Sequence, residues 1–177
     1  MTEVPSEIRI GRAAPDSAVE LLALQRTCFR EEAELYDDPD IAPLTQTLDG
    51  LRADFQTQTV LGAWVGAQLV GSVRARCEQG VCQIGRLVVH PCHRRKGLGS
   101  ALVAAIEATY PEAAVYELFT GERSERNLRL YRRLGYAEAG SEVVSPRLTL
   151  VRLRKPGKPV AGTPPNPVRC NCAVITR

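Results

Sequence analysis

The chain has 177 residues, of which 44% are hydrophobic and 24% charged, and its formal net charge is +3. This length and composition are those of about one globular domain with its own core, and they exclude a fibrous, a disordered or a disulfide-rich small protein. No apolar run reaches the roughly 18–20 residues of a membrane span. The N-terminal residues have neither the basic nor the apolar segment of a secretory signal, so we expect a cytoplasmic protein.

Charge is distributed unevenly along the chain. Residues 155–177 contain four basic residues, no acid and five of the 12 prolines, a composition that predicts an extended, basic C-terminal tail. The tail is either a disordered appendage or a segment that docks on a neighbouring subunit or in a groove of the domain itself. It follows a single domain over residues 1–154, whose net charge is −1. A domain so close to neutrality lacks a broad basic surface, so we expect no nucleic-acid partner and no membrane partner.

Hydrophobic periodicity predicts an alternation of strands and helices along this domain. The expected strands are 8–12, 59–65, 68–77, 81–90, 115–120, 136–140 and 147–153. The expected helices run from 16 or 17 to 28, then over 46–55, 98–109 and 124–134. The short turns between the second, third and fourth strands predict antiparallel pairing. This order of elements is typical of a mixed α/β or α+β domain.

Two groups of residues between these elements need an interpretation. Residues 31–40 hold six carboxylates and no base, and Pro39 and Pro43 keep at least part of this segment out of regular helix. The cysteines of the domain lack the paired spacing of a zinc site, so we expect free thiols and no metal. These cysteines are Cys28, Cys77, Cys82 and Cys92.

The most informative segment is a basic, glycine-containing turn between the strand 81–90 and the helix 98–109. Gly97 and Gly99 allow the backbone to approach a ligand closely, and the first N–H groups of the helix have no partner within it. The helix dipole and the adjacent basic side chains favour an anion at this point. The turn therefore predicts a phosphate or pyrophosphate site. Leu102 excludes a dinucleotide-binding fingerprint, which needs a third glycine at that position.

A second motif follows the next strand. Asn127 and Tyr131 are four residues apart on one helix face, and the helix ends at Gly135. Together with Arg-x-x-Gly-x-Gly at residues 94–99, this motif resembles the GCN5-related N-acetyltransferase (GNAT) superfamily, over residues 8–153. The resemblance implies the GNAT fold, an α/β domain with a central, twisted, mostly antiparallel sheet of seven strands. Helices flank this sheet, which is splayed between its fourth and fifth strands.

The resemblance also implies a function. Members of the superfamily move the acetyl group of acetyl-CoA directly to a primary amine of a small molecule or peptide, within a ternary complex. The turn would hold the pyrophosphate, the strand before it would pair with the pantetheine arm, and Asn127 would contact the pantetheine or the thioester. The residues implied for cofactor binding are Leu87, Val88, Val89, Arg94, Arg95, Lys96, Gly97, Leu98, Gly99, Ser100 and Asn127. Tyr131 would protonate the leaving thiolate, although it could equally be a core aromatic residue.

The sequence departs from the family at the general base. Gly85 stands where many relatives have a glutamate on the fourth strand. We therefore expect Glu117 to be the base, with Glu34 and Asp37 or a chain of waters as alternatives, although Glu117 could also face solvent. Arg86 either orients an acidic group of the substrate or extends its head to solvent.

The acceptor and the rival functions follow from the same features. In the family the acidic segment 31–40 forms part of the acceptor wall, so a cationic acceptor such as a polyamine, an aminoglycoside or a basic peptide is one hypothesis. A solvated acidic loop is the other. The missing glutamate favours a non-catalytic, regulatory CoA-binding module as the alternative function. A basic adaptor that binds nucleic acid through the helix 123–133 is a further rival, and a homodimer is common in the family.

Overall fold

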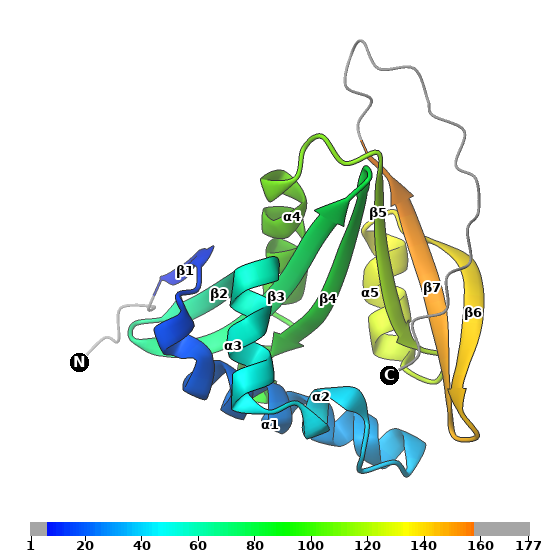
Figure 1. Ribbon diagram of the computed structural model, residues 1–177, viewed down its shortest axis with the longest axis horizontal. Helices are drawn as coiled ribbons and strands as arrows, with labels where there is room; N and C mark the ends of the chain where they lie inside the picture. The colour runs from blue at the N-terminus through cyan, green and yellow to red at the C-terminus, as the bar shows by residue number, and fades with distance from the viewer. Residues whose placement is uncertain (1–6, 158–177) are drawn as a thin grey trace.

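The computed structural model describes residues 7–157, which form a seven-stranded sheet with helices on both faces (Figure 1). The strands are β1 (Ile8–Arg12), β2 (Thr59–Val65), β3 (Gln68–Glu78), β4 (Val81–Val89), β5 (Val115–Gly121), β6 (Ala137–Ser145) and β7 (Leu148–Pro156). The helices are η1 (Pro15–Ser17), α1 (Ala18–Tyr36), α2 (Ala42–Thr45), α3 (Leu48–Thr57), η2 (Pro91–His93), α4 (Leu98–Thr109) and α5 (Glu125–Arg133). The predicted mixed α/β architecture is confirmed.

The sheet is split near its middle. Its strand order is β1-β2-β3-β4-β5-β7-β6, and every neighbouring pair is antiparallel except β4 and β5. These two parallel strands pair only over residues 81–84 and 115–118. Figure 1 shows them together at one end and separating towards the other. The predicted splay is therefore present, and it leaves a gap in the hydrogen-bonded ladder of the described chain.

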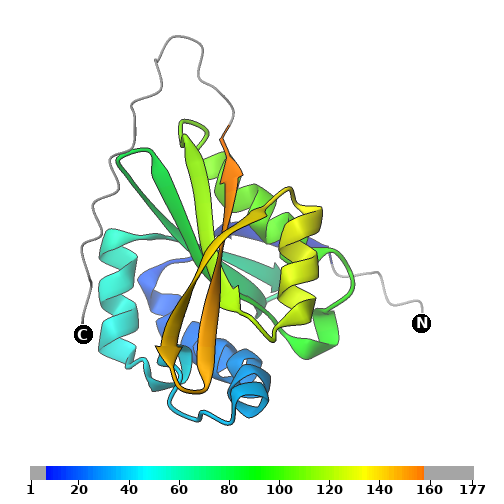
Figure 2. The ribbon, with the colours of Figure 1, turned by 90° about the vertical axis from the view of Figure 1, so that its right-hand side faces the viewer.

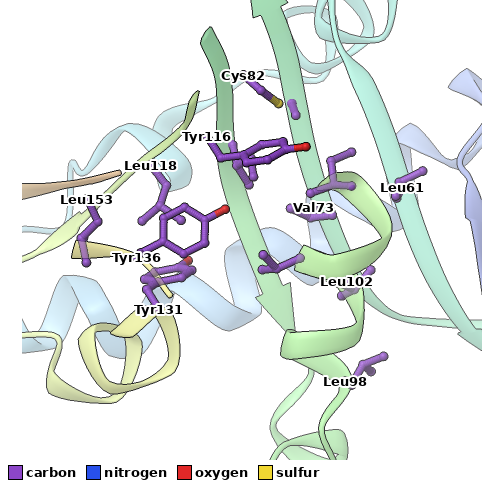
Figure 3. Close-up of a cluster of buried hydrophobic side chains, with 14 of the residues drawn as sticks. Leu61, Val73, Cys82, Leu98, Leu102, Tyr116, Leu118, Tyr131, Tyr136 and Leu153 are labelled. Carbon is purple, nitrogen blue, oxygen red and sulfur yellow. The ribbon is translucent and has the colours of Figure 1, made fainter. Parts of the chain in front are cut away.

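Two hydrophobic clusters hold the layers together. On one face, α4 and α5 cover a cluster that includes Leu102, Leu118 and Tyr131 (Figure 3). On the other face, α1 and α3 cover a second cluster that includes Leu21 and Leu51. Figure 2 shows these helices on the two sides of the sheet. Because side chains of a strand alternate between faces, adjacent residues of one strand serve different clusters.

Helix α1 continues much further than its periodicity predicted. It ends at Tyr36, and Asp37 caps it in a left-handed conformation with φ 48°. Tyr36 is buried, and its hydroxyl accepts a hydrogen bond of 2.6 Å from the backbone N–H of Arg123, after β5. A side chain at Gly121 would collide with the Tyr36 ring, so the close approach requires glycine there. Residues 31–35, Glu-Glu-Ala-Glu-Leu, favour a helix by themselves, and this contact fixes the end of the helix at Tyr36.

The last strand also continues beyond its predicted end at residue 153. Strand β7 includes Lys155, whose ammonium contacts Glu107 Oε2 at 2.8 Å, and the N–H of Gly157 donates to the carbonyl of Ala114. These contacts hold the first residues of the predicted tail against the domain. The rest of the predicted tail, with Cys170 and Cys172, lies outside the described residues. Within residues 7–157, no helix has the length and apolar character needed to cross a membrane.

Candidate active site

A cavity of about 570 Å³ lies at the start of α4, and we name it the α4 cavity. Every residue that the sequence analysis assigned to cofactor binding lines this cavity, except Lys96, which is exposed and lies outside the lining. Helix α1 and helix α5 complete the wall. The residues lining it are Cys28, Phe29, Glu32, Leu87, Val88, Val89, Pro91, Arg94, Arg95, Gly97, Leu98, Gly99, Ser100, Arg126, Asn127, Leu130 and Arg133.

The backbone of the turn is shaped for an anion. Arg95 has φ 63° and Gly97 has φ 78°, so the chain turns sharply before α4 begins at Leu98. No side chain of the described chain caps this helix, and its first turn contains no acid. Its first N–H groups therefore point into the cavity without a side-chain partner, at the positive end of the helix dipole. Such a group of amides fits the pyrophosphate of CoA.

Arg94, the first residue of the turn motif, is already engaged within the protein. Its Nε donates to the carbonyl of Val89 at 3.1 Å, and its Nη1 lies 2.7 Å from both carboxylate oxygens of Glu31. Arg126 approaches Glu31 Oε2 at 3.3 Å from α5. The hydrogen bond from Arg94 lowers the pKa of Glu31 below its usual value. A pyrophosphate would have to compete with this carboxylate for Arg94.

Strand β4 supplies the next part of the cavity. Beyond Ile84 it has no strand beside it on the β5 side within the described residues. Leu87, Val88 and Val89 line the α4 cavity along this edge. Backbone N–H and C=O groups of an unpaired edge can pair with an extended ligand, in this case an arm such as pantetheine.

A second cavity, of about 890 Å³, lies on the α1 and α3 side of the splay, and we name it the central cavity. Its wall is assembled from α1, the segment that follows it, α3, β3, β4, β5, α5 and the β6–β7 hairpin. The charged residues in this wall are Glu32, Asp38, Asp40, Asp54, Arg74, Arg76, Arg86 and Glu117.

The two cavities meet at a small set of shared residues. Phe29, Glu32, Leu87 and Asn127 line both of them. The Nδ2 group of Asn127 is 3.4 Å from Thr120 Oγ1 at the end of β5. A ligand extending from the α4 cavity would therefore meet a ligand of the central cavity beside Glu32 and Asn127.

Tyr131 lies one helical turn after Asn127 and contributes to the wall of the central cavity. It is 6% exposed and packs edge-on against Tyr136, with 6.0 Å between the ring centroids (Figure 3). Burial, reinforced by the negative charge of Glu32, raises the pKa of Tyr131 above its ordinary value. Its hydroxyl therefore stays protonated, and none of residues 7–157 takes that proton in a hydrogen bond.

Glu32 is the ionisable residue of this junction, and the sequence analysis did not single it out. Its side chain is half-buried, and Oε2 accepts a hydrogen bond of 3.1 Å from the hydroxyl of Ser124. Burial raises the pKa of Glu32 above its usual value. Helical spacing could have identified it, since Cys28, Glu32 and Tyr36 share one face of a helix that continues to residue 36.

The expected bases lie elsewhere in the site. Glu117 is 5% exposed in the wall of the central cavity, but its Oε2 receives a hydrogen bond of 2.6 Å from Arg154 Nε. Glu34 and Asp37 line neither cavity, and the carboxylate of Asp37 lies 3.2 Å from Arg147. At Gly85, an added Cβ would meet no atom of the described chain within 4 Å. The place of the absent glutamate is therefore open space in the central cavity.

Comparison with known proteins decides the family. The model of the acetyltransferase (GNAT) family matches residues 18–136, a span that contains both sequence motifs and both cavities' shared residues. The chain belongs to the GNAT family. The predicted membership and the predicted GNAT fold are thereby confirmed.

Individual relatives of this GNAT protein are distant. The protein YqkA of Bacillus subtilis is 28% identical over 122 residues, which are 69% of this chain and 35% of YqkA. The chain thus spans about a third of the length of this curated relative. Among solved structures, the ribosomal-protein-S18-alanine N-acetyltransferase of Escherichia coli superposes with a TM-score of 0.72 at 12% identity, covering 89% of this chain and 99% of that one. For yncA of Salmonella typhimurium, solved with acetyl-CoA, the TM-score is 0.69 at 17% identity, covering 92% and 100%. These likenesses show a shared fold.

Proposed function

We propose that the protein is an N-acetyltransferase that moves the acetyl group of acetyl-CoA directly to a primary amine of a small molecule or peptide. The observation that carries this proposal is the junction of the two cavities at Glu32 and Asn127, beside the protonated hydroxyl of Tyr131. Family membership supports acetyl transfer. The relatives solved with acetyl-CoA, and with CoA in the N-acetyltransferase of Thermoplasma acidophilum, support the cosubstrate.

In this proposal acetyl-CoA lies in the α4 cavity. The amides at the start of α4 bind the pyrophosphate, with the Arg94 side chain beside them. The open edge of β4 pairs with the pantetheine arm, and a backbone N–H of Val88 or Val89 faces the thioester oxygen. Such a fixed donor stabilises the negative charge that develops on that oxygen during attack.

We assign the general base to Glu32. An alkylammonium has a pKa of about 10.4, so the acceptor must lose a proton before its nitrogen can attack the thioester carbon. A carboxylate whose pKa is raised by burial is a better proton acceptor than an exposed one. Glu32 takes this proton, the C–N bond forms, and the C–S bond breaks as Tyr131 gives its proton to the departing thiolate. The nitrogen loses its second proton to solvent as the amide forms, and exchange with solvent restores the protonation states of Glu32 and Tyr131.

Glu117 remains the second candidate for the base. It lies in the same cavity wall, but Arg154 already occupies one oxygen of its carboxylate. Glu34 and Asp37 are weaker candidates because they lie outside both cavities.

The test is to incubate the purified chain with acetyl-CoA and a panel of amines that includes polyamines, aminoglycosides, amino acids and short peptides. Mass spectrometry of the products and of the protein is expected to show an acetylated amine and unmodified protein. Binding of acetyl-CoA without any product would instead support the regulatory CoA-binding module, and an acetylated protein would contradict direct transfer. The homodimer and the cytoplasmic location stay predictions, which gel filtration and cell fractionation would test.

A further inference from the structure

Arg86 is a charged residue of the central cavity for which the reaction itself has no use. It lies in β4 at an irregularity of the β3–β4 pairing, between Gly85 and Leu87. Its φ of 52° is a left-handed conformation, which a long side chain adopts at a cost in free energy. Its side chain is half-buried in the cavity wall. Among residues 7–157 it has neither a hydrogen bond nor an ion pair.

The acid whose charge acts on Arg86 is engaged by other residues. This acid is Asp54, and both of its carboxylate oxygens accept hydrogen bonds from side chains other than Arg86. Oδ2 accepts from Arg74 and, at 2.6 Å, from Gln46, while Oδ1 accepts from Gln58 at 3.0 Å. Burial lowers the pKa of Arg86, and the negative charge of Asp54 acts in the opposite direction. Charged groups in such places are usually paired, and this one lacks its partner within the described chain.

A second cation lies behind the first. Arg74, on β3, is 2% exposed and also lines the central cavity. It is bound by Asp54, Gln25 and Gln46, but its Nε is buried without any partner in the described range. Burial lowers the pKa of Arg74 to about 10, and the positive charge of Arg86 contributes in the same direction. Two neighbouring guanidinium groups therefore face one carboxylate, and this part of the acid-rich wall carries one positive charge that no carboxylate of the group balances.

The position of Arg86 assigns its missing partner to the ligand of the central cavity. Arg86 lines that cavity, and Leu87, the next residue of β4, lines both cavities. An anion bound to Arg86 would therefore belong to the molecule whose amine reaches the junction. Glu32 at that junction is an acid suited to the ammonium group, while Arg86 is suited to an anion.

We propose that Arg86 binds a carboxylate of the acceptor, so that the substrate is an amino acid or a related amine that carries a carboxylate. A guanidinium donates two parallel hydrogen bonds to a planar carboxylate and thereby fixes its orientation as well as its position. This substrate class rests on the proposed function. It differs from the purely cationic acceptor that the acidic segment suggested, because the acceptor carries an anion for Arg86 as well as an ammonium group for the carboxylates, of which Glu32, Asp38 and Asp40 come from that segment.

The experiment compares matched acceptors and matched variants. The 20 common amino acids and their decarboxylated or amidated counterparts are offered with acetyl-CoA, and kcat/KM is measured for each pair that is acetylated. A charge-assisted hydrogen bond corresponds to about a 10–100-fold preference for the member that carries the carboxylate. Arg86→Gln is expected to abolish this preference by raising the KM of the amino acid, without changing the KM of acetyl-CoA. Arg86→Lys keeps the positive charge but cannot donate two parallel hydrogen bonds, so its preference for the carboxylate is expected to be intermediate.

Arg52→Gln is the control, because Arg52 is an exposed arginine on α3 outside both cavities. Arg52→Gln is expected to leave kcat/KM unchanged for every acceptor, and thermal melting shows whether each variant is folded.

The carboxylate site would be overturned if kcat/KM were equal for both members of each pair and did not change in Arg86→Gln. That outcome would leave the proposed acetyltransferase activity intact. If no amine is acetylated, the proposed function fails. Saturation-transfer NMR of the same amino acids with the CoA complex then still tests the site: binding lost in Arg86→Gln supports it, and no binding to the parent chain overturns it.

Discussion

The α4 cavity and the central cavity lie side by side but are built in different ways. Most of the α4 cavity comes from one continuous stretch, residues 87–100, and its binding groups are backbone amides at a helix start. The wall of the central cavity is assembled from eight segments spread over most of the domain, and its binding groups are charged side chains. A ligand shared by a whole family can be bound by backbone geometry, whereas an acceptor specific to one member needs side chains.

The arginines of the two cavities differ in the same way. Arg94 of the α4 cavity is paired with an exposed carboxylate, Glu31, at the surface. Arg74 of the central cavity is buried in a network of acid and amides, and Arg86 beside it has no partner within residues 7–157. The arginine pair of the central cavity is therefore more deeply buried than that of the α4 cavity. Removing one of its partners is expected to lower the free energy of unfolding more.

The largest effect is expected at Asp54. Asp54→Ala leaves the buried guanidinium of Arg74 without its acid, and loss of one partner of such a pair costs about 3 kcal/mol of unfolding free energy. The matched change in the α4 cavity, Glu31→Ala, breaks a more exposed pair and is expected to cost less than about 1 kcal/mol. Urea denaturation of both variants measures the two values. Equal losses would contradict the contrast between the two cavities.

Tyr131→Phe is expected to give the next largest effect. The change removes the proton donor for the thiolate but keeps the ring that packs against Tyr136, so kcat should fall about 10–1000-fold while the fold is kept. The KM of acetyl-CoA should change little. Steady-state kinetics would remove Tyr131 from the mechanism if kcat were unchanged.

Glu32→Gln is expected to lower kcat/KM by about 100-fold, in line with the loss of a general base. In the parent enzyme, kcat/KM should rise with pH through a pKa above that of an ordinary glutamate, because burial raises the pKa of Glu32 and the base must be ionised. The variant should lack this rise. The open space at Gly85 allows a second test, in which Gly85→Glu in the Glu32→Gln background restores part of the activity.

Glu32→Gln lowers activity in this proposal, but it is not expected to lower stability at neutral or alkaline pH. A carboxylate whose pKa is raised in the folded state contributes stability below its unfolded pKa and loses it as the pH rises through the folded pKa. Glu32→Gln removes this loss and keeps an acceptor for Ser124, so the variant should be at least as stable as the parent at pH 8. At pH 4 the parent keeps the stability that protonated Glu32 contributes, so the free energy of unfolding of the parent relative to the variant should be higher than at pH 8. Melting curves at the two pH values provide the measurement, and Glu117→Gln, which breaks the Arg154 pair, should instead destabilise at pH 8.

The smallest effect is expected at Glu31. Glu31→Gln weakens its hold on Arg94 and leaves this arginine available for the pyrophosphate, so the KM of acetyl-CoA should fall by about two- to five-fold. Calorimetric titration with CoA would show the same change in affinity. A rise in KM would mean that Glu31 positions Arg94 for the cofactor and does not compete with it.

Helix ends were predicted accurately where the signals that set them lie within the segment, and less accurately where a distant contact sets them. Helix α4 begins and ends at the predicted residues, 98 and 109, because its apolar spacing and its glycine N-cap act within the segment. The end of α1 was missed because the apolar spacing stops at Cys28, although residues 31–35 favour a helix. The contact that fixes the end at Tyr36 is made with Gly121 and Arg123, which follow it by more than 80 residues. The error mattered for the site, because it hid the shared face on which Glu32 lies.

The sequence by itself determined the fold class, the GNAT family and the turn that fits a pyrophosphate. These depend on periodicity and on motifs within short segments, where residues near in the chain are also near in space. Only the tertiary structure decided which carboxylate lies at the junction, that Glu117 is engaged with Arg154, and that Arg86 faces a cavity with no partner in the described chain. Side-chain pairing and burial depend on contacts between distant segments, and neither leaves a local pattern in the sequence.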